Sequence, residues 1–561
     1  MRRWLPLLAV CLGTFMLLID VTIVNVALPD MVGDLHASFG SLQWVVDAYA
    51  LALAALVLGT GSVADLVGHR RAYVAGLVVF AASSLACGVA PGPTALIAAR
   101  TVQGIGAAAM FATTFALLNR SYSGRDRGTA YGLWGAVSGA SAAVGPIIGG
   151  LLTQGASWRW IFFVNLPVSV VAIVLSVVVF GDAGEPATGG PAVGGPATGG
   201  PATGGPAVGG PAGSRPAMGR RGVDVPGILT FTAAAGCATY ALIRANENGW
   251  SSAATWWTLG LAAVLLVAFV AVESRSRGAM LDLALLRNRS FVGVLIAGLL
   301  MTFAAFAAFT YTSIWLQSVL GLSPIEAGLT GLPMSVMSFV VSATAGRRLH
   351  GTPPHRVIGG GLLCVGLGDA LVALLVHGSA GWPALMPGFA VIGVGVGLVT
   401  PILGSVSMSL VPANRGGMAA GAVNTTRQLG FAFGIAALGS AFTVGARGSL
   451  SGRGVAGAAR VARAVAGGQA PSLRGTVPAA ARHALDEAVR AAAVAGVRGT
   501  FALAAAVGVV AAFLVLYLMR PDRSSSRTSG RAGEPAGAPE AVTAEPAGER
   551  PAGKRQAATV R

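Results

Sequence analysis

Residues 61–71 read GSVADLVGHRR, a short polar and basic stretch between two long apolar runs. Gly61 and Gly68 permit a tight turn, because glycine adopts backbone angles that other residues avoid. Asp65 can accept hydrogen bonds from an arginine or from the N terminus of a helix. The basic end, Arg70–Arg71, favours the cytoplasmic side of a membrane. The stretch therefore predicts a tight cytoplasmic loop that joins two membrane-spanning helices.

The composition of the whole chain also indicates a membrane protein. Of 561 residues, 54% are hydrophobic and 11% are charged, and the mean hydropathy is +0.71. A soluble protein of this size could not cover its surface with so few charges. Because crossing the hydrocarbon takes roughly 20 residues, the long apolar runs are expected to span the membrane.

The apolar runs predict fourteen membrane-spanning helices and hence an all-α integral membrane fold. Their expected ranges are 5–28, 42–62, 72–90, 94–118, 129–153, 160–181, 224–244, 254–273, 291–316, 326–346, 357–377, 384–409, 420–445 and 498–519. An even number of spans places both termini on the same side.

The distribution of arginine predicts the orientation of these spans. Alternate loops, at 30–41, 91–93 and 378–383, contain no lysine or arginine, whereas the loops between them are basic. The positive-inside rule then puts both termini in the cytoplasm. It also accounts for the net charge of +17 without a nucleic-acid partner. Segment 446–497 carries seven arginines yet is expected to be a long extracellular loop, which the rule tolerates because long loops translocate largely regardless of charge.

Two segments are predicted to lack a fold. Residues 186–210 repeat Pro-Ala-(Thr/Val)-Gly-Gly five times, so residues 182–223 are expected to form a flexible cytoplasmic linker. The tail at 520–561 is rich in Arg, Ser, Pro, Ala, Gly and Glu, and is expected to be disordered in the cytoplasm.

Two of the sequence motifs place a charged residue inside a predicted span. Residues 18–29 read LIDVTIVNVALP and place Asp20 among apolar side chains, and residues 96–107, LIAARTVQGIGA, do the same for Arg100. A charge at mid-bilayer costs about 2.5–3.5 kcal/mol on insertion scales, so each residue needs a partner or water. Asp20 can also become neutral by taking up a proton, as proton coupling requires. A purely structural, hydrogen-bonded role is the alternative for both residues.

The fifth predicted span contains a run of small residues. Residues 145–150 read GPIIGG, in which Gly145, Gly149 and Gly150 offer a flat strip for close helix contact. Pro146 is expected to add a kink.

These patterns, in this order, resemble those of the major facilitator superfamily and its fourteen-span drug:proton antiporters. Residues 18–29 are similar to the first-span motif of that branch, and 61–71 resemble the signature cytoplasmic loop of the superfamily. Residues 96–107 resemble the fourth-span motif, and 145–150 the antiporter motif. Residues 158–167, WRWIFFVNLP, resemble the start of the sixth span.

The sequence also departs from the family pattern at several points. Leu66 replaces the arginine that usually follows the loop aspartate, and His69 stands where arginine is common. Ser141 occupies a place where a third antiporter-motif glycine often occurs. The matching loop of the second half, at 346–348, has no acid. These departures concern the details of gating at the loop.

The resemblance implies a major facilitator fold of two six-helix bundles with a binding cavity near the midplane. The bundles would be residues 1–181 and 274–519, joined through the linker by two extra helices at 224–273. A monomer is expected, because nothing in the sequence marks an oligomer interface. The expected partners are membrane lipid, a small-molecule substrate and protons.

Three acids are placed well inside the predicted spans and are candidates for proton coupling. They are Asp20, Asp47 and Asp369. Related multidrug members also carry an acid at the place of Asp47, near the outer end of the second span. No motif surrounds Asp369. A structural role is the alternative for Asp47 and Asp369 as well.

The expected function is proton-coupled antiport, with export of small amphipathic drugs or antibiotics across the bacterial cytoplasmic membrane. No cofactor beyond the proton gradient is expected. The only lysine is Lys554, so no phosphate-binding GxxxxGK[ST] loop exists and an ATP-driven pump is excluded. The six histidines are scattered and form no HExxH motif, which argues against a metalloenzyme. An importer or facilitator of a specific solute on the same fold, or a non-transporting membrane sensor, are the alternatives.

Overall fold

The structure is a computed structural model in which residues 2–35, 39–180, 224–248, 252–276, 279–348, 352–412 and 415–520 are described. The predicted linker at 182–223 and the predicted disordered tail, beyond Arg520, lie outside the described residues. Within the described ranges every regular element is a helix and none is a strand.

The first part of the chain forms six long helices, the last of which is broken near its start. After a short turn at Arg2–Trp4 come α1 (Leu5–Asp34), α2 (Phe39–Val67), α3 (His69–Gly88), α4 (Pro93–Ser121), α5 (Gly124–Gly155), α6 (Trp160–Phe163) and α7 (Asn165–Val179). The predicted sixth span at 160–181 is thus divided at Val164 into α6 and α7.

The remaining elements comprise a helix pair and a second set of long helices. The pair is α8 (Val225–Asn248) and α9 (Ala253–Arg275). The second set is η2 (Leu283–Arg287), α10 (Arg289–Met301), η3 (Thr302–Phe306), α11 (Ala307–Ile314), η4 (Trp315–Val319), α12 (Pro324–Leu329), α13 (Leu332–Arg348), α14 (Pro354–Leu375), η5 (Trp382–Leu385), α15 (Met386–Ser409), α16 (Gly416–Gly452), α17 (Ala458–Ala466), α18 (Ala470–Leu473), η7 (Arg474–Thr476), η8 (Ala479–Ala481) and α19 (Arg482–Leu518). Elements η3 and η4 are π-helical turns on either side of α11.

The number of long helices agrees with fourteen spans. Thirteen candidate spans in the described residues are long and apolar enough to cross a membrane. Helix α5 runs for 32 residues and packs between α1 and α13, and with it the count reaches fourteen. The structure therefore confirms the predicted all-α membrane fold.

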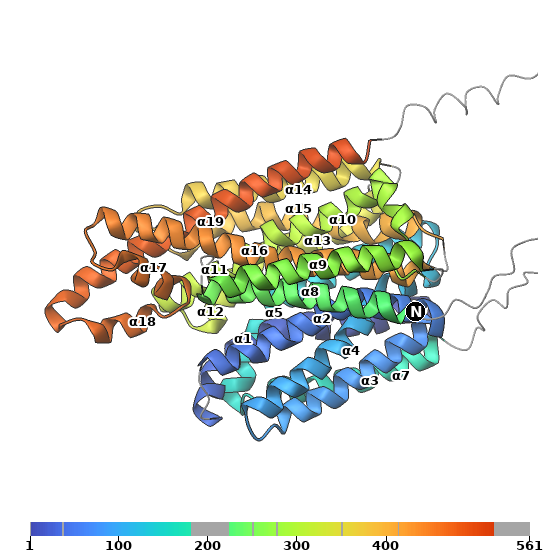
Figure 1. Ribbon diagram of the computed structural model, residues 1–561, viewed down its shortest axis with the longest axis horizontal. Helices are drawn as coiled ribbons and strands as arrows, with labels where there is room; N and C mark the ends of the chain where they lie inside the picture. Colours follow the sequence, from blue (N-terminus) through green and yellow to red (C-terminus); the bar gives the residue numbers. More distant parts are fainter. Residues whose placement is uncertain are drawn as a thin grey trace, which may run out of the picture. The chain divides into compact units, whose positions relative to one another are not determined.

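The structure differs from the sequence prediction in segment 446–497, which was expected to be a long loop. Helix α16 continues to Gly452 and α19 already begins at Arg482, so both helices run well beyond their predicted spans. For α19 the alanine-rich sequence at 482–497 favours this extension, because alanine has the highest helix propensity. Between them α17 packs on its apolar side through the buried Ala462 and Val465. In Figure 1, α17 and α18 lie at the left, at the opposite end of the helices from the N terminus.

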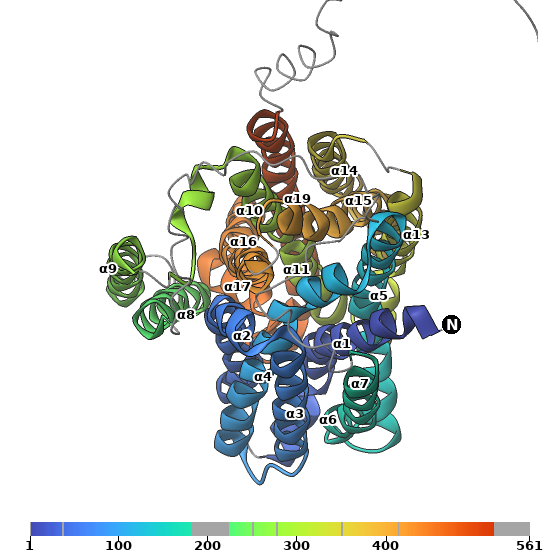
Figure 2. The same ribbon diagram turned by 90° about the vertical axis from the view of Figure 1, so that its right-hand side faces the viewer.

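The long helices form two groups that meet along two interfaces. Figure 2 shows α1, α2, α3, α4 and α7 on one side and α10, α14, α15 and α19 on the other, with the pair α8–α9 beside α2. Helix α2 packs against α16, and α5 packs against α13. Glycines allow both contacts, since a Cβ atom on Gly132 would lie 2.5 Å from the carbonyl oxygen of Ser342. A Cβ on Gly61 would meet the carbonyl oxygen of Gly417.

Replacing Gly61 with alanine is expected to push α2 away from α16 and to lower the free energy of unfolding by about 1–3 kcal/mol, because backbone cannot yield as a flexible side chain can. The measurement is thermal unfolding of the purified protein in detergent. Gly260→Ala on α9 is the matched control, because a Cβ there meets nothing within 4 Å. An equal effect of the two substitutions would contradict the prediction.

Candidate proton-coupling site

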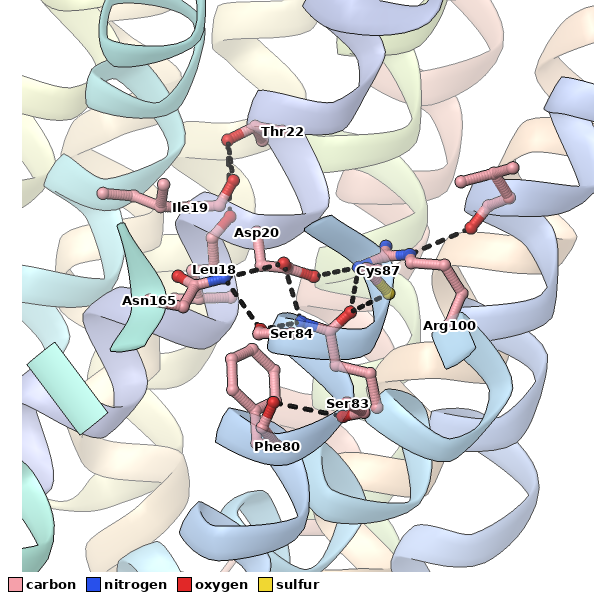
Figure 3. A network of polar contacts seen from close by, with 12 residues as sticks. Leu18, Ile19, Asp20, Thr22, Phe80, Ser83, Ser84, Cys87, Arg100 and Asn165 are labelled. Atoms are coloured by element: carbon pink, nitrogen blue, oxygen red, sulfur yellow. Dashed lines mark hydrogen bonds and ion pairs between the residues drawn. The ribbon is translucent and has the colours of Figure 1, made fainter. Parts of the chain in front are cut away.

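The two charged residues singled out inside spans, Asp20 on α1 and Arg100 on α4, form an ion pair. Arg100 Nη1 lies 2.5 Å from Asp20 Oδ2, and both side chains are 0% exposed. Their elements meet because α1 packs against α4 within the first group of helices. Each of the two charged side chains therefore has its counter-charge within the buried part of the helices (Figure 3).

Three uncharged side chains complete the hydrogen bonding of this pair. Gln103 Nε2 donates to Asp20 Oδ1 over 3.1 Å, and Asn165 Nδ2 donates to the same oxygen over 3.2 Å. Both amides also donate to Ser84 Oγ, over 2.7 and 3.2 Å. Gln103 Oε1 in turn accepts from Arg100 Nη1 over 2.6 Å. We call Asp20, Ser84, Arg100, Gln103 and Asn165 the Asp20 network.

Arg100 also ties the Asp20 network to α2. Its Nε donates to the carbonyl oxygen of Val45 over 3.0 Å. Its guanidinium lies over the ring of Tyr49, 4.2 Å from the ring centroid, in a cation–π arrangement. Arg100 therefore links α1, α2 and α4, and any displacement of its side chain changes contacts on all three helices.

The Asp20 carboxyl group is held by several partners at once. Its carboxylate accepts three hydrogen bonds, one of them from the Arg100 guanidinium, and charge-assisted bonds of this kind are about twice as strong as neutral ones. A buried pair is stable only while both partners stay together, because separating them leaves an uncompensated charge. In this structure the pair is shielded from solvent, so a proton can reach Asp20 only after the surrounding helices move.

Sequence reasoning missed three members of the network, Ser84, Gln103 and Asn165. Gln103 follows Arg100 by three residues and so shares its helix face, which is a signal the sequence carried. Asn165 is a lone amide in the apolar run at 158–167. Ser84 lies in an apolar helix, where serine commonly bonds its own backbone, and no pattern marked it.

The structure does not bring the other two candidate acids into this network. Asp47 is partly buried on α2, two residues before Tyr49. Asp369 is fully buried on α14, in the second group of helices. Asp369 thus lies in a different group of helices from Asp20, whereas Asp47 lies on α2, the helix that Arg100 contacts through Val45 and Tyr49.

Asp65, in the predicted tight loop, caps the N terminus of α16. Its Oδ1 accepts from the backbone N–H of Gly417 over 2.7 Å, and its Oδ2 accepts from that of Met418 over 2.8 Å. These N–H groups have no partner within their own helix, and the helix dipole adds a favourable charge interaction. Gly68 has a positive φ of 96°, the conformation for which glycine is suited, and it separates α2 from α3.

The basic residues around this loop have different surroundings. Arg70 Nη2 donates to the carbonyl oxygen of Val177 at the end of α7, over 3.0 Å, whereas Arg71 is exposed. Arg415, just before α16, pairs with Asp282 over 2.5 Å. Arg70 thus ties the loop to its own group of helices, whereas Asp65 ties it to α16 in the second group.

The small residues of α5 lie between the two groups of helices. A Cβ atom on Gly145 would meet the Thr22 side chain, and one on Gly150 would lie 2.5 Å from the Ile325 side chain. Gly149 is buried and its carbonyl accepts from Thr153 over 2.8 Å, and Pro146 lies within the helix. Gly145 thus packs on α1 at Thr22, two residues after Asp20. Gly150 packs on Ile325 of α12.

Comparison with known proteins identifies the family. A family model described as Major Facilitator Superfamily matches residues 10–435 of the chain. The chain belongs to the major facilitator superfamily. As in other major facilitator proteins, its long helices form two six-helix bundles, here with α8 and α9 as an additional pair.

Named members of the superfamily resemble this chain over most of its length. It is 33% identical over 437 residues to the multidrug resistance protein Stp of Mycobacterium tuberculosis (strain CDC 1551 / Oshkosh), covering 78% of this chain and 75% of that protein. It is 30% identical over 534 residues to the tetracenomycin C resistance and export protein of Streptomyces glaucescens, covering 93% and 92%. The crystal structure of the human organic anion transporter MFSD10 (TETRAN) has the same fold, with a TM-score of 0.57 at 13% identity over 91% of this chain and 99% of that one.

Proposed function

We propose that this protein is a proton-coupled antiporter that exports small amphipathic drugs or antibiotics. The observation that carries the proposal is the buried ion pair between Asp20 and Arg100. It provides a carboxylate that can bind a proton and a cation whose position depends on whether that proton is present. The named functions of the relatives, multidrug resistance and export of tetracenomycin C, support drugs as the substrate class.

The coupling step follows from the geometry of the Asp20 network. A proton on Asp20 removes the charge that holds Arg100, so the guanidinium loses its strongest partner. Arg100 then shifts its contacts with Val45 and Tyr49 on α2, and the helices of the first bundle rearrange. Loss of the proton restores the pair. Protonation thus selects between two arrangements of the bundle, which is what coupling to a gradient requires.

The membrane placement is part of the proposal. We place the chain in the bacterial cytoplasmic membrane with both termini in the cytoplasm, as the arginine distribution predicts. The Asp65 cap on α16 then holds the cytoplasmic end of the two bundles together, so the structure represents a state closed to the cytoplasm. The protein acts as a monomer in contact with lipid, without nucleic acid, cofactor or catalytic chemistry.

The proton gradient supplies enough energy for such export. One proton entering moves a charge worth about 2.3 kcal/mol per 100 mV. A pH difference of one unit adds about 1.4 kcal/mol. Together they support a gradient of a neutral drug on the order of several hundredfold.

Two other functions remain alternatives and make different predictions. An importer or facilitator of a specific solute would move its substrate inward, or without proton movement in exchange. A non-transporting sensor would show no coupled flux at all. The test is quenching of a pH-sensitive dye in inside-out vesicles, challenged with a panel of amphipathic compounds. Antiport predicts dissipation of the pH gradient on drug addition, and the absence of any such response to the whole panel would contradict the proposal.

Replacing Asp65 with asparagine is expected to weaken the closed cytoplasmic end. The asparagine side chain has the same size as aspartate but no charge. Its NH2 group replaces one carboxylate oxygen and faces a backbone N–H of α16, so one of the two capping hydrogen bonds is lost. A lost cap of this kind costs about 0.5–2 kcal/mol. A cysteine placed at Gly416, at the start of α16, should therefore react faster with a water-soluble maleimide in the variant.

The matched control for this prediction is Asp486→Asn, which removes an exposed ion pair with Arg474 near the opposite end of the helices. Exposed pairs contribute little, so labelling at Gly416 should not change. Equal labelling rates in Asp65→Asn and in the parent protein would show that the cap does not hold this end closed.

A further inference from the structure

Asp369 on α14 is a buried acid without a hydrogen-bond partner. Its side chain is 0% exposed, and neither carboxyl oxygen has a partner among the described residues. Asp20, in contrast, accepts three hydrogen bonds and faces a guanidinium. The two buried acids therefore have opposite surroundings.

The packing of α14 on α15 repeats that of α3 on α4, residue by residue. A Cβ on Gly76 would lie 2.9 Å from the carbonyl oxygen of Gly106, and one on Gly106 would lie 2.8 Å from that of Gly76. In the second bundle Gly361 and Gly395 approach one another in the same reciprocal way, with a Cβ on Gly361 lying 2.9 Å from the carbonyl oxygen of Gly395.

Equivalent backbone atoms surround the Gly76–Gly106 pair and the Gly361–Gly395 pair. Gly106 also approaches the backbone nitrogen of Phe80, four residues after Gly76, and Gly395 approaches that of Val365, four residues after Gly361. This agreement fixes which residues of the two bundles correspond.

The correspondence places Asp369 where the first bundle has Ser84, a member of the Asp20 network. Ser84 follows Gly76 by eight residues, and Asp369 follows Gly361 by eight. The positions of Arg100 and Gln103 are taken by residues that cannot donate a hydrogen bond from their side chains. They are Phe389 and Ile392, both buried. The second bundle thus has an acid at the position equivalent to Ser84, but it lacks the arginine and the glutamine that belong to the Asp20 network in the first bundle.

Among the described residues, the elements that pack on α14 supply no cation that pairs with Asp369. The elements η3, η5 and α15 that pack on α14 contain no ionisable side chain, and α10 carries only Arg289, at its first residue. Helix α14 itself contributes His355 and Arg356 at its start, and Cys364. On α19, Ala505 lies beside Gly366 of α14, and Arg498 is exposed seven residues away, about 10 Å along the helix.

The remaining ionisable residues of α19 stand near its two ends. They are Arg482, His483, Asp486, Glu487, Arg490 and Tyr517. A carboxylate with neither a cation nor a donor is far less stable in an apolar interior than the neutral acid, because burying an isolated charge is strongly unfavourable. These surroundings therefore favour the protonated, neutral form of Asp369.

We propose that Asp369 is a second proton-binding site of the transport cycle, occupied in the state closed to the cytoplasm and emptied when the second bundle rearranges. The inference rests on the proposed proton-coupled export. The helices around Asp369 pack closely through glycines, since a Cβ on Gly366 would lie 2.8 Å from the backbone nitrogen of Val509 and one on Gly368 2.7 Å from that of Ile392. Small sliding movements of packed helices of this kind expose or seal a buried group.

The first arm of the test measures the proton directly. A protonated carboxyl shows a C=O stretching band in the infrared spectrum of the purified protein in lipid, which an ionised carboxylate lacks. At neutral pH the band assigned to a dry, unbonded carboxylic acid should disappear in Asp369→Asn and persist in Asp20→Asn. Persistence of the band in Asp369→Asn would show that Asp369 is not protonated and would overturn the proposal.

The second arm measures the number of protons moved per drug molecule, from the membrane potential that stops drug flux in proteoliposomes with fixed gradients. Asp369→Asn should fold, because the amide resembles the neutral acid, and its ratio should fall by one proton. Asp369→Ser, which introduces the residue of the first bundle, is the second variant and should give the same ratio. An unchanged ratio in both variants would overturn the second site alone. A wild-type protein that moves drug without any proton would overturn the proposed export mechanism itself, whatever the infrared band shows.

Discussion

Replacing Asp20 with asparagine is expected to abolish drug-dependent proton movement and to destabilise the protein. The substitution leaves Arg100 buried without a counter-charge, and an arginine side chain cannot become neutral by losing its proton. Removing one partner of a buried ion pair costs about 3–5 kcal/mol. The measurements are dye quenching in inside-out vesicles and the midpoint of unfolding in detergent. Asp369 would still bind its proton, but without Asp20 the first bundle has no group through which protonation moves Arg100.

The matched control is Asp126→Asn. Asp126 pairs with Arg3 over 3.2 Å, and both side chains are exposed, so this ion pair should contribute little. Wild-type quenching in Asp20→Asn, with wild-type amounts of protein in the membrane, would remove Asp20 from the mechanism.

Replacing Arg100 with methionine is expected to abolish coupling with a smaller loss of stability. Asp20 then faces no cation, but a carboxyl can take up a proton and become neutral, whereas the guanidinium in the reverse case cannot. The remaining loss comes from the hydrogen bond to Val45 and the contact with Tyr49, together about 1–3 kcal/mol. The order of unfolding midpoints should be wild type, then Arg100→Met, then Asp20→Asn.

The double variant Asp20→Asn with Arg100→Met separates stability from function. Both charges are gone, so no uncompensated charge is buried, and its unfolding midpoint should lie above that of Asp20→Asn. Proton-coupled export should remain absent. A double variant less stable than Asp20→Asn would show that the pair is not the source of the destabilisation.

The local sequence was sufficient to predict most of the helices and the charged members of the site. Long apolar runs gave the fourteen spans because crossing a membrane imposes a length. Asp20 and Arg100 could be identified because a charged residue inside an apolar run is energetically costly and usually has a function. Their pairing could not be predicted with certainty, since it depends on how α1 meets α4.

Other features depended on contacts between distant parts of the chain. The Asp65 cap joins residues in α2 to the N terminus of α16, and nothing in residues 61–71 indicates which helix is capped. The correspondence of Ser84 and Asp369 rests on the glycine contacts of two bundles, which only coordinates reveal. The early start of α19 at Arg482 could not be predicted from hydropathy, which marks only the part of a helix that spans the membrane.

The most direct measurement of the central claim is proton release on drug binding to the purified protein in a weakly buffered solution. If drug binding and protonation of Asp20 compete through Arg100, wild-type protein releases protons when a transported drug is added below neutral pH. The double variant Asp20→Asn with Arg100→Met, bound by the same drug, should release at least one proton fewer per drug. Equal proton release by the two proteins, at equal drug occupancy, would show that the Asp20–Arg100 pair is not where transport and protonation are coupled.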